Sequence, residues 1–289
     1  FPLLKINQGV DLTDTPYSLG NYRFFESSQG VWMLATFLSN VAGHFLTKLP
    51  MGGTLLGMKF YTSLLVSGMA LFSYRFFKTK MPSFLAFAGE MAAIGFCWCP
   101  TGILYNYMTY LFFLVGAVLL FRGLAGSRPA CLFLAGICLG LNVSVRFPNV
   151  LEASLIVAVW YYGSRKRKSF ERLARETALC AGGFLAAQAA MFLVITARYG
   201  LGAYEELIDG LFGMSAGASD YTLGEMLGSI LSAYGRGFEW MLHMLLCILP
   251  GIPFPVSGKF LHICSNNGVT EGFPLIGGQK VPFCVRITH

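Results

Sequence analysis

The sequence predicts an all-α protein, a polytopic bundle of transmembrane helices with further helices at the membrane surface. Of its 289 residues, 55% are hydrophobic and 12% are charged, and the mean hydropathy is +0.60. Soluble domains carry about 25% charged residues, so half that share, together with long apolar runs, indicates an integral membrane protein. The net charge of +7 comes from basic residues that flank the apolar runs, as they do in membrane helices, and predicts no nucleic-acid partner.

The N-terminal part predicts segments that do not cross the membrane. Because residues 1–6 resemble the end of a longer segment, we expect a first span before them. Residues 7–30 predict a polar, acidic loop outside the membrane. Residues 31–48 are apolar but include Ser39, Asn40 and His44, and they are fewer than the about 20 residues that a span needs. We therefore expect a helix that lies in the membrane interface.

About seven transmembrane helices are expected between residues 55 and 254. Each is an apolar run that ends at basic residues or at proline, which are typical ends of membrane helices. The expected spans are 55–77, 83–99, 103–121, 129–145, 150–162, 177–197 and 238–254. Together with the preceding segments they form one domain, 1–256. The tail, 257–289, is polar and rich in glycine and proline, and we assign it no function.

The charges of the connecting turns predict the orientation. The turns after the first, third and fifth spans are strongly basic, and basic residues concentrate on the cytoplasmic side of a membrane. In a plasma or inner membrane, the loop 7–30, Tyr105, Arg146 and the loop 199–237 would then share the outer face. This last loop has helical patches at 204–212 and 223–234, and its length indicates either that it covers a site or that it is disordered.

The outer loop carries the strongest candidates for chemistry. Asp11 and Asp14 place two carboxylates three residues apart, and Tyr17 and Arg23 follow them. A carboxylate within hydrogen-bond reach can remove the proton from a hydroxyl nucleophile. The alternative is a solvated loop with no special role.

Other residues on the same face could bind a phosphate or a sugar. Arg146 ends a span where a lipid head group would lie, and a guanidinium group binds two phosphate oxygens at once. The alternative is an arginine that only marks the end of a helix. Arg23 and Lys59 are further candidates for this role, against ordinary surface or interfacial positions. Tyr105 could contact a sugar or an acceptor, or belong to an aromatic belt at the interface.

Two segments resemble the GT-C superfamily of membrane glycosyltransferases. Asp14-Thr-Pro-Tyr17 matches an acidic first outer loop, and residues 135–148, AGICLGLNVSVRFP, are similar to a helix of the protein-mannosyltransferase and lipid A aminoarabinose-transferase branches. The resemblance covers roughly residues 7–255. In these families an Asp of the first outer loop acts as base or electrostatic partner, and position assigns that role to Asp14. The usual pattern is Asp-Glu; Thr15 replaces the Glu here, and Asp11 could supply the second acid.

The resemblance implies an enzyme that transfers a sugar at the outer face of the membrane. The donor would be a sugar on a polyprenyl-phosphate carrier, and the acceptor a lipid, a glycan or a protein. Arg146 would hold the carrier phosphate. The resemblance implies no definite cofactor, and it is compatible with the use of a divalent metal ion. Cys97-Trp-Cys99 has one residue between its thiols, which is a poor spacing for a zinc or redox site.

A transporter or flippase of an anionic or lipid-linked substrate is the alternative function. Glu90 lies in the middle of the span 83–99, where an acid costs about 2.5–3.5 kcal/mol. It is either a proton relay or a helix-packing hydrogen bond. A transporter should also contain paired broken helices near the middle of the membrane. The third possibility is a non-catalytic membrane protein. It would need neither paired broken helices nor a site on the outer face where the acids and Arg146 meet.

Overall fold

A computed structural model describes residues 2–7, 14–27, 31–96 and 102–216, with five further residues between 228 and 235. Apart from those five, the described residues belong to a unit formed by residues 1–217. Asp11, the expected span 238–254 and the tail 257–289 lie outside the described residues, as does most of the helical patch 223–234.

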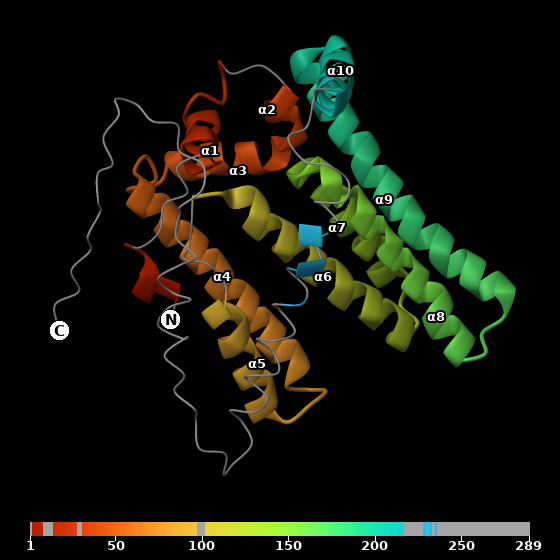
Figure 1. Cartoon of the computed structure of the whole chain (residues 1–289). Helices are drawn as coiled ribbons and strands as arrows, with labels where there is room; N and C mark the ends of the chain where they lie inside the picture. The colour runs from red at the N-terminus through yellow and green to blue at the C-terminus, as the bar shows by residue number, and fades with distance from the viewer. Residues whose placement is uncertain are drawn as a thin grey trace. The chain divides into compact units, whose positions relative to one another are not determined.

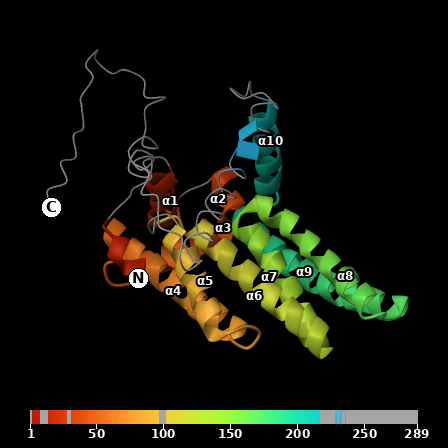
Figure 2. The ribbon, with the colours of Figure 1, turned by 60° about the horizontal axis from the view of Figure 1, so that its bottom comes forward.

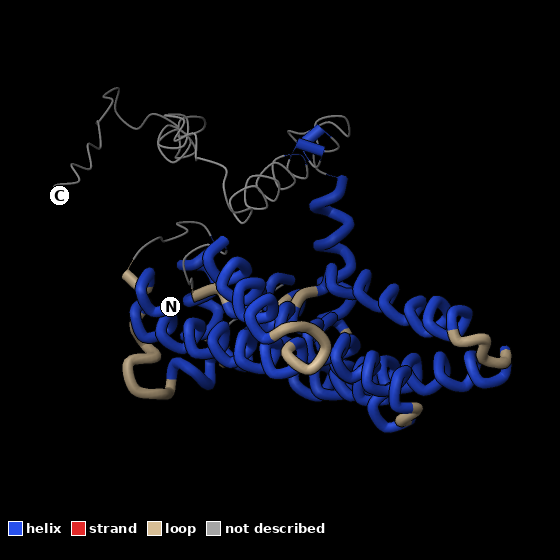
Figure 3. The backbone as a smooth tube through the Cα atoms, turned by 90° about the horizontal axis from the view of Figure 1, so that it is seen from below, coloured by secondary structure: helices blue, strands red, loops and turns tan. Residues whose placement is uncertain are grey.

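All regular structure in the described residues is helical (Figures 1 and 3), as the sequence predicts. The elements in chain order are η1 (Pro2–Lys5), α1 (Asp14–Arg23), α2 (Val31–Ala35), α3 (Phe37–Thr47), α4 (Leu55–Phe77), α5 (Ser83–Phe96), α6 (Leu104–Gly126), α7 (Pro129–Val145), η2 (Phe147–Ile156), α8 (Val157–Arg165), α9 (Phe170–Tyr199) and α10 (Gly202–Ala216). Here η denotes a 3-10 helix.

Three helices, α4, α6 and α9, are long and apolar enough to cross a membrane. The described part therefore supports a membrane protein, with fewer full-length spans than the sequence predicts. Helix α7 has 17 residues and α5 has 14. At 1.5 Å per residue, α5 extends only about 21 Å against a hydrocarbon layer of about 30 Å, so its described residues are too few for the expected span 83–99.

The expected span 150–162 is wrong as a continuous α-helix. Helix α7 ends at Val145, Arg146 has extended backbone, and residues 147–156 form the 3-10 helix η2 before α8 begins. Pro148 explains the break, because proline has no backbone N–H to donate to the carbonyl oxygen four residues earlier, and its ring would clash with that carbonyl group in an α-helix. A 3-10 helix of ten residues is unusually long, and polar contacts described below hold it in place.

Glycines allow α7 to pack closely against α9, and Figure 2 shows α6, α7 and α9 running side by side. A Cβ atom at Gly136 would overlap the carbonyl oxygen of Cys180, and one at Gly183 would overlap that of Phe133. A Cβ atom at Gly140 would lie 2.6 Å from the carbonyl oxygen of Phe184. Small residues four apart are typical of helix contacts in membranes, where close packing rather than water exclusion drives association.

Helices α1, α2 and α3 lie together at one end of the long helices (Figure 1). Residues 31–48, expected as one interfacial helix, form two helices with a break at Thr36. Asn40 bridges this break, because its Nδ2 donates to the carbonyl oxygen of Met33 at 3.2 Å and to Thr36 Oγ1 at 3.0 Å. The expected loop 7–30 contains the helix α1, which begins at Asp14.

The basic turns meet at the other end of α6. Lys80, after α4, places its Nζ 5.2 Å from the ring centroid of Phe121 near the end of α6. Arg172, in the first turn of α9, donates from Nη2 to Ser127 Oγ at 2.5 Å. The turns after α4, α6 and α8 thus share one end, which we call the basic end; we call the end with α1 the Asp14 end. Which end faces the cytoplasm stays a prediction.

Candidate functional site

Three of the residues singled out from the sequence meet at the Asp14 end, each from a different helix. The Tyr105 hydroxyl, at the start of α6, donates to Asp14 Oδ2 at the start of α1 at 3.0 Å. The guanidinium carbon of Arg146, directly after α7, lies 5.3 Å from the centroid of the Tyr105 ring, within cation–π range. Asp14 and Arg146 are exposed and Tyr105 is half-buried. An acid, a hydroxyl and a cation are therefore accessible side by side.

A buried tyrosine fixes α1 against the start of α6. Tyr22 is fully buried, and its hydroxyl accepts the backbone N–H of Leu104 at 2.9 Å. Its ring fills the space that a side chain at Gly43 of α3 would occupy, and its carbonyl oxygen lies 2.9 Å from His44 Nδ1. Burial raises the pKa of Tyr22. These contacts from α3 and α6 place Asp14 beside Tyr105.

A second polar group lies one helical turn deeper between α6, α7 and η2. Thr109 is four residues after Tyr105 on α6, so the two share a helix face. Asn149 Nδ2 donates to Thr109 Oγ1 at 2.7 Å and to Asn142 Oδ1 at 3.2 Å. Asn142 Nδ2 donates to Glu152 Oε2 at 2.5 Å and to the carbonyl oxygen of Thr109 at 3.2 Å. Polar side chains therefore continue from the exposed rim into the helix bundle.

Glu152 also lines a cavity of about 440 Å³. The other lining residues are mostly apolar and come from α6, η2 and α8: Phe113, Leu151, Ser154, Leu155 and Ala158. The Asn142 amide holds one carboxylate oxygen of Glu152. A carboxylate next to an apolar cavity, with one oxygen held by an amide, could recognise a hydroxyl group or a cation.

Sequence reasoning missed the members of this deeper group. Glu152 lies in an apolar run that was expected to be a span, and Asn142 lies inside the expected span 129–145, where no role was assigned to it. A signal was present, because Phe147-Pro148 interrupts the run and Asn149 and Glu152 follow it three residues apart. Polar residues next to a helix break are typical of sites inside membrane proteins.

The other predicted site residues that the structure describes take no part in the contact of Asp14, Tyr105 and Arg146. Tyr17 lies on α1 and is 49% exposed. Arg23 is exposed at the end of α1, nine residues and about 13 Å along the helix from Asp14. Lys59, a candidate phosphate ligand with a surface or interfacial position as the alternative, is only 3% exposed in the first turns of α4. Tyr17 alone of these three shares with Asp14 both the first turns of α1 and an exposed side chain.

Neither a metal centre nor a mid-membrane ion pair is present in the described residues. No group of three or more His, Cys, Asp or Glu side chains in that part of the chain is arranged to hold a metal ion. Glu90, on α5, is half-buried and has no hydrogen bond or ion pair with any described residue. Of these two acids, it is therefore Glu152 that has a polar partner in the bundle, not Glu90.

No protein-family model matches the chain, and no curated protein and no solved structure is similar to it.

Proposed function

We propose that this protein is a GT-C-type glycosyltransferase that moves a sugar from a polyprenyl-phosphate carrier to an acceptor hydroxyl at the membrane surface. The observation that carries the proposal is the contact of Asp14, Tyr105 and Arg146 at one end of the helix bundle. Asp14 and Arg146 are 132 positions apart in the sequence, and the chemistry needs an acid and a cation close together.

Each group has a role in the proposed transfer. Asp14 accepts the proton of the acceptor hydroxyl while the acceptor oxygen bonds to the anomeric carbon. The bond between that carbon and the phosphate oxygen breaks, and its electron pair stays with the phosphate. Arg146 stabilises the charge that develops on the phosphate oxygens, which a planar guanidinium group can bind in pairs. Tyr105 is a positioning residue, because it contacts both the acid and the cation.

Release of the carrier tests this proposal without knowledge of the acceptor. The full chain in lipid nanodiscs would be given polyprenyl-phosphate sugars and mixed acceptors, and the release of polyprenyl phosphate would be measured. Asp14→Asn should lower the rate about 10²- to 10⁴-fold, the usual contribution of a general base. Glu205→Gln, which removes an exposed acid from α10, should leave the rate unchanged. Equal rates for Asp14→Asn and the parent protein would remove Asp14 from the mechanism.

A transporter or flippase is a second candidate function, and the helix break at η2 favours it. Glu152 lies in this broken segment and accepts a hydrogen bond from the Asn142 amide on α7, and broken helices carry the substrate or ion sites of many transporters. In sealed vesicles, a flippase would move the lipid-linked sugar across the bilayer without release of polyprenyl phosphate. Glu152→Gln should then stop movement, whereas Asp14→Asn should not.

A further inference from the structure

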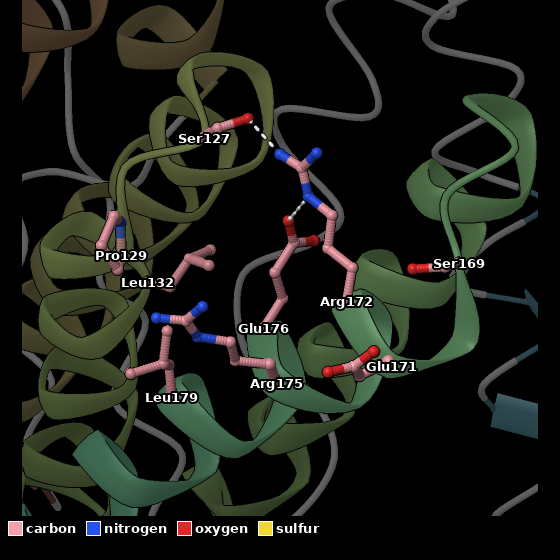
Figure 4. A pocket seen from close by; sticks show the side chains of 9 residues that line it. All are labelled: Ser127, Pro129, Leu132, Ser169, Glu171, Arg172, Arg175, Glu176 and Leu179. Atoms are coloured by element: carbon pink, nitrogen blue, oxygen red, sulfur yellow. Dashed lines mark hydrogen bonds and ion pairs between the residues drawn. The ribbon is translucent and has the colours of Figure 1, made fainter.

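A second cavity, of about 520 Å³, lies at the basic end, at the opposite end of α6 from Asp14. Its lining residues come from the turn between α6 and α7 and from the first turns of α9, and Figure 4 shows their side chains: Ser127, Pro129, Leu132, Ser169, Glu171, Arg172, Arg175, Glu176 and Leu179. One part of the lining is cationic and hydroxylated, and another is apolar. This cavity has no part in the proposed sugar transfer.

The acid within this lining is already neutralised by the protein. Glu176 is 6% exposed, and its two carboxylate oxygens accept from Lys168 Nζ at 2.7 and 2.8 Å. Arg172 Nε donates to the same carboxylate at 3.1 Å. One buried negative charge thus faces two cations, and Arg172 keeps further N–H donors on a guanidinium group that is about half exposed.

Arg175 supplies a cation that no described residue neutralises. It lies three residues after Arg172 on α9, so the two arginines project from neighbouring positions of the helix (Figure 4). Arg175 is exposed and makes no hydrogen bond or ion pair with the described part of the chain. The lining also contains Glu171, so the charge balance of Lys168, Arg172 and Arg175 against the two acids is one positive charge.

Exposed aromatic side chains near this cavity indicate that it lies at the level of a membrane interface. Trp160 of α8 and Phe170 of α9 pack against each other with tilted rings whose centroids lie 5.7 Å apart, and Phe170 is 74% exposed. Tyr161 is 71% exposed. Exposed aromatic rings beside basic residues are typical of the head-group level of a bilayer, whereas in water such a cluster would be unfavourable.

We propose that this cavity binds the phosphate group of an anionic phospholipid. Arg175 and the free donors of Arg172 face the phosphate oxygens, the Ser169 hydroxyl adds a hydrogen bond, and the apolar residues Pro129 and Leu179 contact the glycerol and upper acyl region. Arginine fits this role because its planar fork matches two phosphate oxygens. Basic pockets between membrane helices are known to bind anionic lipid head groups. The apolar part of the lining favours a lipid over a free phosphate ion.

Lipid binding by the detergent-solubilised full chain tests this inference. Native mass spectrometry would measure the retention of a single phosphatidylglycerol molecule, with phosphatidylcholine as the uncharged comparison. Arg175→Gln should weaken phosphatidylglycerol binding about fivefold, as expected for one basic residue near an anionic lipid. Glu171→Gln, which removes an acid from the lining, should strengthen it. Arg122→Gln is the matched control, because Arg122 is exposed at the same end but outside the cavity.

Three results would overturn the inference. The first is an equal loss of lipid binding in Arg122→Gln and Arg175→Gln, which would mean diffuse attraction rather than a site. The second is equal retention of phosphatidylcholine and phosphatidylglycerol by the parent protein. The third is full displacement of the lipid by inorganic phosphate at millimolar concentration, which would identify free phosphate as the ligand. Because Arg175 has no partner within the described chain, Arg175→Gln should unfold at the same temperature as the parent protein.

Discussion

Tyr105 makes two separable contacts, and this allows its role to be tested residue by residue. Its hydroxyl holds Asp14, and its ring lies against Arg146. Phenylalanine would keep the ring and remove the hydroxyl, whereas leucine would remove both. Comparison of the two substitutions therefore separates the effect of a displaced Asp14 from the effect of a displaced Arg146.

If the proposed transfer is correct, Tyr105→Phe should lower kcat about ten- to a hundredfold, because small displacements of a catalytic group are costly. KM for the lipid-linked donor should change little. Tyr105→Leu should also raise KM, by about two- to fivefold, since it loses a cation–π contact. Steady-state rates of polyprenyl phosphate release measure both constants. A role for Tyr105 in packing alone would instead lower the unfolding temperature and leave the rates of the folded protein unchanged.

Tyr22 affects stability rather than chemistry. Tyr22→Phe should reduce the free energy of unfolding by about 1–3 kcal/mol, because the buried N–H of Leu104 loses its acceptor. Thermal unfolding in detergent would measure the difference. Burial raises the pKa of Tyr22, so the folded protein keeps a proton that the unfolded chain releases above about pH 10. Stability should therefore fall as the pH rises above 10, and Tyr22→Phe should weaken this dependence.

At the scale of the elements, apolar length and end signals predict some helices well. The expected bounds 55–77 and 129–145 agree with α4 and α7. Helix α6 continues to Gly126, past Arg122, because an exposed arginine does not end a helix. Helix α9 begins at Phe170, seven residues before the expected span, because Glu176 is neutralised by Lys168 and Arg172 and can be buried. The ion pairs of Glu176 cannot be predicted from hydropathy alone.

The contact between α7 and α9 can be tested with two adjacent glycines. Gly183 faces α7 and leaves no space for a Cβ atom, whereas a Cβ atom at Gly182 would have no neighbour within 4 Å. Gly183→Leu should therefore destabilise the protein by at least about 1–3 kcal/mol through overpacking. Gly182→Leu, which has the same effect on helix propensity, should be neutral or stabilising. Unfolding temperatures of the two variants provide the comparison, and equal values would exclude close packing at Gly183.

Across the whole molecule, part of the candidate site follows from the sequence and part does not. Asp14 was found as an acid of the polar loop 7–30, and Tyr105 and Arg146 because each lies near the end of an apolar run. The turn charges predicted that all three share one face. Glu152 and Asn149 were missed because their partners lie on other helices. Such pairings depend on helix packing and on the 3-10 geometry of η2, which a single sequence does not specify.

The separation of the two ends predicts opposite membrane sides. Tyr17→Cys at the Asp14 end and Lys166→Cys at the basic end place a thiol on exposed residues, in a background whose native cysteines are replaced. In intact cells, a membrane-impermeant maleimide should label Tyr17→Cys, and Lys166→Cys only after permeabilisation. Labelling of both variants in intact cells would contradict the predicted topology.

The hydrogen bond from Leu104 to Tyr22 couples the motions of two helices. The first amide of α6 has its acceptor on α1, so a swing of α1 away from the bundle exposes that amide to solvent. The same swing would separate Asp14 on α1 from Tyr105 on α6, so an opening of this end for substrate entry would take the acid and the ring apart. Hydrogen exchange at the Leu104 amide is the direct reporter of such an opening.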